Sequence, residues 1–129
     1  MDRIFTVEEA KSLLPKVLEH VRELVTLRAD LAELSYDLKQ SGLSAIGGIP
    51  ESKAYEARMD EILSWFAAEG MEIKGIAPVL IDFPAVLEDG VSVRLCWLEG
   101  EEELAWYHRS ELGFSGRRPL LDDHAQSHA

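Results

Sequence analysis

Residues 79–98 read VLIDFPAVLEDGVSVRLCWL, and this stretch decides the fold of the C-terminal half of the chain. Apolar side chains alternate with a period of two on both sides of Glu88, Asp89 and Gly90. A period of two is typical of β-strands, and a three-residue connection ending in glycine is typical of a hairpin loop. The stretch therefore predicts an antiparallel β-hairpin.

Pairing across a three-residue loop decides which side chains share a face of the hairpin. The odd-numbered residues of 79–87 and 91–97 then form one apolar face, which is the predicted core side. The other face has Asp82 opposite Cys96 and Pro84 opposite Arg94. Because proline has no amide hydrogen, Pro84 predicts that the first strand is a sheet edge at that point.

A third strand is predicted over residues 104–108, after a turn at residues 99–103. If Leu98 pairs with Leu104, His108 lies on the same face as Asp82 and Cys96. If the register shifts by one residue, His108 lies on the core side instead. The sequence leaves both registers open. Residues 111–121 are predicted to be irregular, and residues 122–129 to form a disordered tail.

The first half of the chain has the periodicity of helices. Thr6 and Glu9 form a capping box that predicts a helix start at Val7. Between residues 13 and 38, apolar residues recur at alternating spacings of four and three, which is typical of a coiled-coil seam. His20 is the one polar member of this series, and we expect it to fix the register of paired helices rather than to sense pH.

A glycine-rich stretch at residues 41–50 ends the first helix and predicts a loop. A second helix of about twenty residues follows and ends at Gly70, which is placed for a left-handed cap. The predicted fold is α+β: a long antiparallel helical hairpin over residues 6–70 and a small three-stranded antiparallel sheet within residues 71–121. With 129 residues, 47% of them hydrophobic, we expect one domain over residues 1–121.

The charge and the cysteine content of the chain limit the partners and the cellular location that we expect. The chain has 24 acidic and 13 basic residues, a formal net charge of −11, so we expect no nucleic acid and no anionic membrane as partner. Its single cysteine, Cys96, cannot form an internal disulfide, and no apolar run is long enough to span a bilayer. We therefore expect a cytoplasmic protein.

Several short motifs along the chain resemble one known family. They are Phe5-Thr6-x-Glu8-Glu9-Ala10 with Leu13-Leu14-Pro15, Asp82-Phe83-Pro84-Ala85, Leu95-Cys96-Trp97 with Gly100-Glu101, Trp106-x-His108 and Gly113-Phe114-x-Gly116-Arg117-x-Pro119-Leu120. In this order they resemble an uncharacterised bacterial family known only as a domain of unknown function. The resemblance implies a small cytoplasmic bacterial protein with a helical hairpin and a C-terminal sheet. It implies no activity, so no catalytic residue is assigned.

The candidate site lies on the predicted sheet. Asp82, Trp97, Trp106, His108 and Arg117 are the candidate ligand-binding residues. A carboxylate and an imidazole beside the Cys96 thiol are metal ligands and also the parts of an activated nucleophile. The alternative, which we favour, is a buried hydrogen-bonded Asp and His beside an inert Cys. No established metal-binding spacing is present, so neither a metal nor a cofactor is assigned.

Two further motifs have a functional and a structural interpretation. Arg117, in the glycine-rich loop 113–119, either binds an anionic ligand or pairs with an Asp or Glu of the sheet, such as Asp82, and holds the C-terminal segment against the sheet. The four glutamates of residues 99–103 lack the ligand pattern of a calcium loop, so we expect a solvated hairpin tip. The tail histidines, His124 and His128, are assigned no role.

These observations favour a non-catalytic self-association or protein-interaction module, with homodimers forming through the helices. The alternative is a binder of a small ligand or metal, or an enzyme, with its site near Asp82, Trp97, His108 and Arg117. A pocket lined by these residues would favour the alternative. A filled core with Arg117 paired to Asp82 would favour association.

Overall fold

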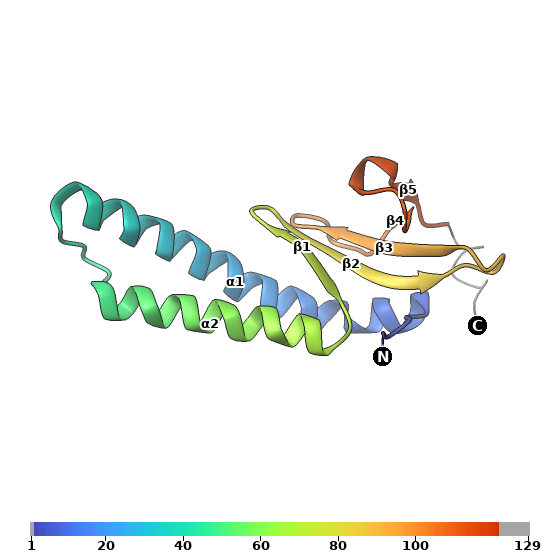
Figure 1. Cartoon of the computed structure of the whole chain (residues 1–129), viewed down its shortest axis with the longest axis horizontal. Coiled ribbons are helices and arrows are strands. Elements are labelled where there is room, and N and C mark those ends of the chain that lie inside the picture. Colours follow the sequence, from blue (N-terminus) through green and yellow to red (C-terminus); the bar gives the residue numbers. More distant parts are fainter. Residues whose placement is uncertain (1, 122–129) are drawn as a thin grey trace. The chain divides into compact units, whose positions relative to one another are not determined.

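The computed structural model describes residues 2–121, so the predicted disordered tail and both tail histidines lie outside the described residues. The described chain divides into two compact units. One holds the residues up to Val17 together with those from Phe66 onward, and the other holds residues 18–65. Both helices contribute residues to the first unit, which also contains the sheet (Figure 1).

Helix α1 (Val7–Ser41) begins at the predicted capping box and continues through Pro15. The Glu9 amide donates to Thr6 Oγ1 at 3.0 Å, and the Thr6 amide donates to Glu9 Oε1 at 2.9 Å. Each side chain thereby satisfies an amide that has no partner within the helix. The predicted start of the helix is confirmed.

Replacing Thr6 with alanine is expected to lower the free energy of unfolding by about 1 kcal/mol, because an amide of the first turn loses its acceptor. Urea denaturation measures this change. Thr26→Ala is the matched control, since the Thr26 hydroxyl donates to the Arg22 carbonyl in the middle of the helix and caps nothing. Equal losses in the two variants would contradict a capping role for Thr6.

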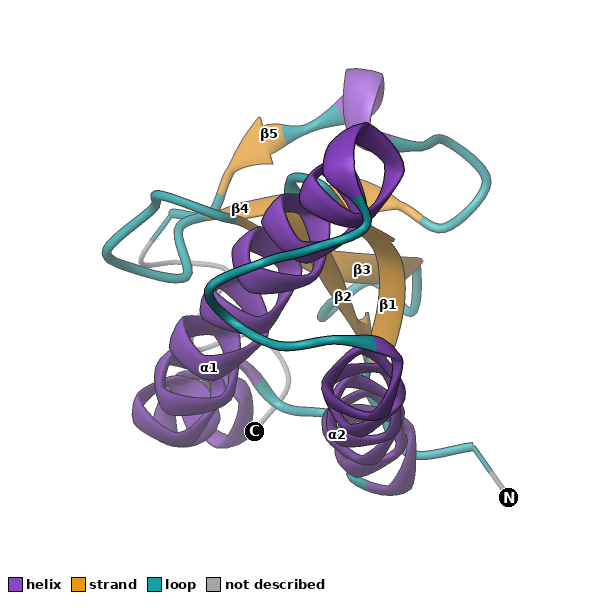
Figure 2. Cartoon of the chain, turned by 90° about the vertical axis from the view of Figure 1, so that its left-hand side faces the viewer, coloured by secondary structure: helices purple, strands orange, loops and turns teal. Residues whose placement is uncertain are grey.

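The unit of residues 18–65 contains most of the helical hairpin that was predicted over residues 6–70. Helix α2 (Ile49–Ala68) lies beside α1 and is joined to it by the loop of residues 42–48 (Figure 2). The His20 ring stacks on Trp65, with ring centroids 3.8 Å apart, and Arg58 donates to both carboxylate oxygens of Glu23 at 2.6 and 2.8 Å. Leu34 is fully buried within this unit.

The sheet has five antiparallel strands in the order β1-β2-β3-β4-β5, two more than predicted. They are β1 (Glu72–Ile76), β2 (Val79–Val86), β3 (Ser92–Leu98), β4 (Trp106–Arg109) and β5 (Arg118–Pro119). The sequence missed β1 because it is short and interrupted by an irregularity between Ile73 and Gly75. It missed β5 because two residues are too few to show a period.

The register of the predicted hairpin is confirmed. Asp82 pairs with Cys96 and Pro84 with Arg94, and Gly90 has a φ of 83° in the loop. A left-handed φ of this kind favours glycine because it has no Cβ.

The third predicted strand is shorter than expected, since β4 begins at Trp106. In β4, Trp106 pairs with Cys96 and His108 with Arg94. Of the two registers that the sequence left open, this is the one that places His108 on the face of Asp82 and Cys96. The C-terminal segment, predicted to be irregular, also contains a short 3-10 helix, η1 (Phe114–Gly116).

One face of the sheet forms the core with the ends of the helices that belong to the same unit. Phe5 packs edge-on against Phe83, with ring centroids 5.3 Å apart, and Val17 and Phe66 are fully buried. Pro84 lies where β2 is no longer paired with β1, and its carbonyl accepts a hydrogen bond from the Phe5 amide at 2.7 Å. Because β1 does not extend to this point, no carbonyl of β1 lacks a donor where the proline has no amide hydrogen. This agrees with the predicted edge position.

No helix within residues 2–121 combines the length and the apolar character needed to cross a membrane.

Candidate functional site

The outer face of the sheet, opposite the core, carries a row of polar and reactive side chains. Glu72, Asp82, Cys96 and Trp106 occupy paired positions on β1 to β4, and paired residues of an antiparallel sheet point to the same face. The period of two in each strand thus brings residues from four separate stretches of sequence into one line.

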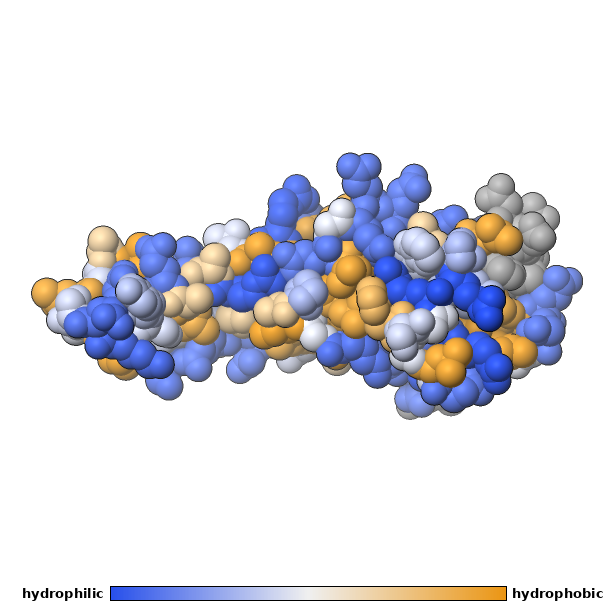
Figure 3. Space-filling model, turned by 90° about the horizontal axis from the view of Figure 1, so that it is seen from above, coloured by the Kyte–Doolittle hydropathy of each residue, from blue (hydrophilic) through white to orange (hydrophobic). Residues whose placement is uncertain are grey.

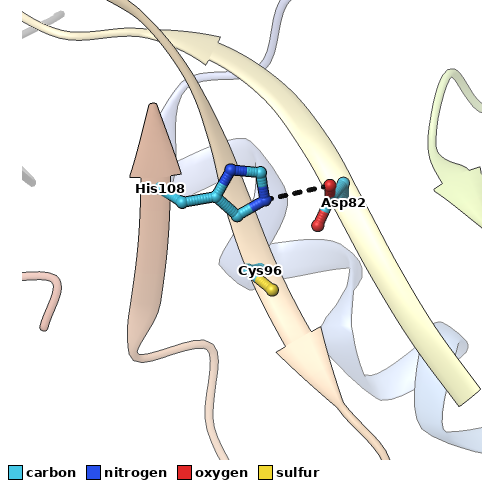
Figure 4. A group of neighbouring side chains, drawn as sticks. All are labelled: Asp82, Cys96 and His108. Carbon is cyan, nitrogen blue, oxygen red and sulfur yellow. Dashed lines mark hydrogen bonds and ion pairs between the residues drawn. The ribbon is translucent and has the colours of Figure 1, made fainter. Parts of the chain in front are cut away.

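Asp82 and His108 form a buried pair on this face. His108 Nε2 lies 3.1 Å from Asp82 Oδ2, and each residue is 3% exposed (Figure 4). The other ring nitrogen, Nδ1, lies 2.8 Å from the carbonyl oxygen of Arg109. The second carboxylate oxygen, Asp82 Oδ1, is buried and accepts no hydrogen bond from the described residues. Asp82 thus keeps an unused buried acceptor, which is costly in a folded protein.

Cys96 lies next to this pair on β3. Its thiol, the His108 ring nitrogen and an Asp82 oxygen all lie within 4.8 Å of one another. Burial, and secondly the negative charge of Asp82, raise the pKa of the Cys96 thiol to about 12. A thiol in this state is protonated at neutral pH and is a poor nucleophile. The trio therefore lacks the activated thiolate that nucleophilic catalysis requires.

The raised pKa of Cys96 predicts a pH dependence of stability at the alkaline end. Between pH 9.0, the ordinary pKa, and about 12, the unfolded thiol is ionised whereas the folded thiol keeps its proton. The free energy of unfolding should fall as the pH rises through this window and should be unaffected by this group below it. Cys96→Ala should remove that part of the slope, as measured by urea denaturation at several pH values. Identical slopes in both proteins would contradict the buried protonated thiol.

Arg94 organises the rim of the outer face. Its Nε donates to Glu72 Oε1 at 2.9 Å, and its Nη1 donates to the Ser110 hydroxyl at 2.8 Å. Although burial opposes it, the hydrogen bond from Arg94 lowers the pKa of the Glu72 carboxyl, with Lys74 also contributing. The guanidinium is therefore held in place across strands β1, β3 and the end of β4.

A cavity of about 310 Å³ opens above the buried pair, and we call it the outer-face pocket. Strands of the sheet and the segment after β4 both contribute polar and apolar side chains to its wall. The lining residues are Lys74, Leu80, Asp82, Arg94, His108, Ser110, Leu112, Gly113 and Phe114.

Arg117 lies outside the outer-face pocket and does not pair with Asp82, which corrects the expected structural partner. Its Nη2 donates to both carboxylate oxygens of Glu101, at 2.7 and 2.9 Å, and to the backbone oxygen of Cys96 at 3.1 Å. The guanidinium also lies 4.9 Å from the ring centroid of Trp106 and 4.8 Å from that of Phe114. These contacts hold the C-terminal segment against the sheet through a different carboxylate from the one expected.

The glutamates of residues 99–103 are not all solvated, contrary to expectation. Glu99 accepts a hydrogen bond from the Val79 amide at 2.9 Å, and Glu101 accepts one from the Leu98 amide at 2.7 Å. Of the four carboxylates, Glu101 therefore closes the β3–β4 turn, and Glu99 ties that turn to the start of β2. The sequence could not predict which of the four glutamates form hydrogen bonds, because nothing in their spacing distinguishes Glu99 and Glu101 from the exposed Glu102 and Glu103.

The five candidate residues do not converge on one point. Asp82 and His108 line the outer-face pocket, whereas Trp106 and Arg117 contact each other beside it. Trp97 lies on the core face, paired with Ile81 and 1% exposed, so it cannot reach the pocket.

Sequence reasoning missed several residues of the outer-face pocket. Lys74 lies on a strand that was not predicted, and Ser110 and Leu112 follow β4 without a recognisable motif. Gly113 and Phe114 could have been found from the sequence, because they begin the motif that contains Arg117.

The chain is a small α+β protein with a buried Asp–His pair beneath a pocket on the outer face of its sheet. The family model described as "Uncharacterized conserved protein (DUF2203)" matches residues 3–120, so the chain belongs to this family. The resemblance to an uncharacterised family is thereby confirmed at the level of the family. Comparison with the curated proteins and with the solved structures gave no match.

Proposed function

We propose that the protein binds a small molecule carrying an anionic group in the outer-face pocket. The observation that carries this proposal is the cavity itself, with its buried Asp82–His108 pair. Its volume of about 310 Å³ is at the lower end for small-molecule sites, and its lining combines apolar side chains with a few polar groups, as such sites do. Arg117 contacts Phe114 of the pocket wall but is not itself a lining residue, so its side chain does not fill this space.

The charge of the pocket wall supports an anionic ligand. The chain has a net charge of −11, yet two cationic side chains, Lys74 and Arg94, line the pocket, against one carboxylate, Asp82, among its described lining residues. Both cations also pair with Glu72, at 3.4 and 2.9 Å, which is not a lining residue. The Ser110 hydroxyl, which accepts a hydrogen bond from Arg94, adds a polar group to the lining. Cationic side chains in a concave wall raise the local concentration of anions. A carboxylate or a phosphate on a compact apolar body fits both parts of the lining.

Thermal-shift measurements against small carboxylates and phosphates, in the presence of a chelator, test the proposal. A ligand that binds the folded state raises the melting temperature. Lys74→Glu should weaken binding of any hit by about fivefold or more, because an attractive charge at the rim becomes repulsive. Lys53→Glu, on the exposed face of α2, makes the same change in net charge and is the matched control.

Two results would refute ligand binding in the outer-face pocket. One is a panel in which no compound stabilises the protein at millimolar concentration. The other is a hit whose affinity falls equally in Lys74→Glu and Lys53→Glu, since binding would then follow net charge and not the pocket.

Self-association through the helices stays a second candidate function, favoured by a separate observation. Tyr36, Leu43 and Ile49, near the turn between α1 and α2, are 64%, 79% and 65% exposed. Orange residues mark this end of the hairpin at the left of Figure 3. A second copy offers the same three side chains, so twofold pairing would cover both sets.

Sedimentation at tens of micromolar is expected to show a dimer that Leu43→Glu with Ile49→Glu converts to a monomer. The reason is that two charges placed in an apolar contact must be desolvated on pairing. Lys39→Glu with Lys53→Glu, also on exposed positions of the hairpin, controls for added negative charge. A monomeric parent protein would refute this second candidate.

A further inference from the structure

The geometry points to a site for a divalent zinc-class metal ion, held by Asp82 and His108, which line the outer-face pocket, and by the buried Cys96 beside them. The three residues come from neighbouring strands β2, β3 and β4, and their side chains gather on the same face (Figure 4). One ligand atom from each lies within 4.8 Å of the others. A tetrahedral ion with bonds of about 2.0–2.3 Å would bring such atoms slightly closer together.

The tautomer of His108 gives the first argument for a cation. The Arg109 carbonyl oxygen can only accept a hydrogen bond, so the ring nitrogen 2.8 Å from it, Nδ1, carries a hydrogen. In a neutral imidazole the other nitrogen, Nε2, then has only a lone pair. Nε2 faces Asp82 Oδ2 at 3.1 Å, where two lone pairs would oppose each other without a proton or a metal ion. A histidine whose Nδ1–H donates to a backbone carbonyl is the usual arrangement of a metal ligand.

The unused oxygen of Asp82 gives the second argument. Asp82 is 3% exposed, and its Oδ1 is buried without a hydrogen-bond donor among the described residues. A buried acceptor left in this state costs about 1–3 kcal/mol, and more when it is charged. A cation coordinated by the carboxylate compensates the charge of Asp82.

The donor set selects the class of ion. A thiolate, an imidazole and a carboxylate together are ligands that zinc accepts, whereas magnesium and calcium prefer oxygen ligands alone. Binding converts the Cys96 thiol to a thiolate, forming the sulfur–metal bond and releasing its proton to solvent. The protonated thiol of the metal-free protein is therefore the starting state and does not argue against the site.

Three protein ligands leave one coordination position of a tetrahedral ion open, and two of the three, Asp82 and His108, line the outer-face pocket. A water molecule fills such a position in the absence of other ligands. An anionic group held near Lys74 and Arg94 is suited to replace this water. The inference deepens the proposed function and rests on it only for the nature of this fourth ligand.

Titration of the full-length, metal-free protein with Co²⁺ near neutral pH tests the site. We expect one Co²⁺ per chain, a sulfur-to-cobalt charge-transfer band, displacement by Zn²⁺ and release of the Cys96 proton. Cys96→Ser and His108→Gln should each weaken binding by at least about 10- to 100-fold, the loss seen even when an outer partner of a metal ligand is removed. Circular dichroism identifies variants that remain folded, and two independent variants keep the test valid if one does not.

The tail histidines provide the matched control, because His124 and His128 are spaced as potential ligands outside the described residues. The double variant His124→Ala with His128→Ala should bind Co²⁺ with unchanged affinity and an unchanged charge-transfer band. Loss of binding in this variant would overturn the inference, as would a band that survives Cys96→Ser. Absence of Co²⁺ and Zn²⁺ binding at millimolar concentrations would overturn it too.

The two proposals fail separately. Ligand binding that persists in chelator, in a protein that gives no cobalt band, would overturn the metal site and leave the proposed function standing. A cobalt band in a protein that no carboxylate or phosphate stabilises, with or without metal, would establish the metal site and refute the anionic ligand.

Discussion

Replacing Arg117 with methionine is expected to lower the free energy of unfolding by about 3–5 kcal/mol, the cost of removing one partner from a buried ion pair. The side chains of Arg117 and Glu101 are only 11% and 22% exposed, so the abandoned carboxylate would have little access to water. The substitution also removes the donor to the Cys96 carbonyl and the contacts with the Trp106 and Phe114 rings. Urea denaturation measures the loss.

The neighbouring arginine provides the control for this prediction. Arg118→Met, at an exposed position in β5, should change the free energy of unfolding by about 0.5 kcal/mol or less. A double-mutant cycle with Glu101→Gln then measures the coupling between the two partners. Equal effects of the Arg117 and Arg118 variants, or additive effects in the cycle, would contradict a structural role for the Arg117–Glu101 pair.

Arg117→Lys separates the contribution of the ion pair with Glu101 from that of stacking on the aromatic rings. Nη2 is the terminal nitrogen of Arg117 that donates to Glu101, and Nε is buried without an acceptor among residues 2–121. Lysine can supply a single donating nitrogen but not a flat group that stacks on two aromatic rings. We therefore expect a loss smaller than that of Arg117→Met.

The second large effect concerns Trp97, which the sequence placed among the ligand-binding candidates. Trp97→Ala is expected to lower the free energy of unfolding by about 3–5 kcal/mol, because it leaves a large cavity in the core. The side chain is 1% exposed, and its Nε1 donates to the Glu101 carbonyl at 3.0 Å. Urea denaturation measures this loss of stability as well.

Trp106→Ala is the matched control, because Trp106 is half-buried on the outer face and has less surface to lose. We expect a clearly smaller loss from this variant. If Trp97→Ala were as stable as Trp106→Ala, Trp97 would not be a core residue.

Much of the fold could be predicted from local patterns because the physical cause of each element is local. The capping box at Thr6 and Glu9 sets the start of α1 through hydrogen bonds three residues apart. Gly90 sets the hairpin loop, and the loop length sets the register of β2 and β3. From that register alone, Asp82 and Cys96 follow as neighbours on the face away from the core.

The sequence could not decide the partners that depend on longer connections. Arg117 had several carboxylates within reach, and the choice of Glu101 depends on how the C-terminal segment returns along β4 as β5. Lys74 lines the outer-face pocket because it lies on β1. The irregularity in this strand interrupts the alternation of apolar and polar residues by which a strand is predicted. Which partner such a side chain contacts depends on the relative energies of competing tertiary contacts. The residues next to it in the sequence do not indicate these energies.

By itself, the sequence determined the α+β class, the helical hairpin, the β-hairpin and the face that carries Asp82 and Cys96. The tertiary structure alone decided that His108 joins them, because a shift of one residue in β4 would have turned its side chain to the core. It also decided that Arg117 stays out of the outer-face pocket and that a cavity remains above the Asp82–His108 pair. The physical reason is that hydrogen bonds between residues close in sequence fix local structure, whereas the register of β4 and the side-chain partners depend on packing over the whole sheet.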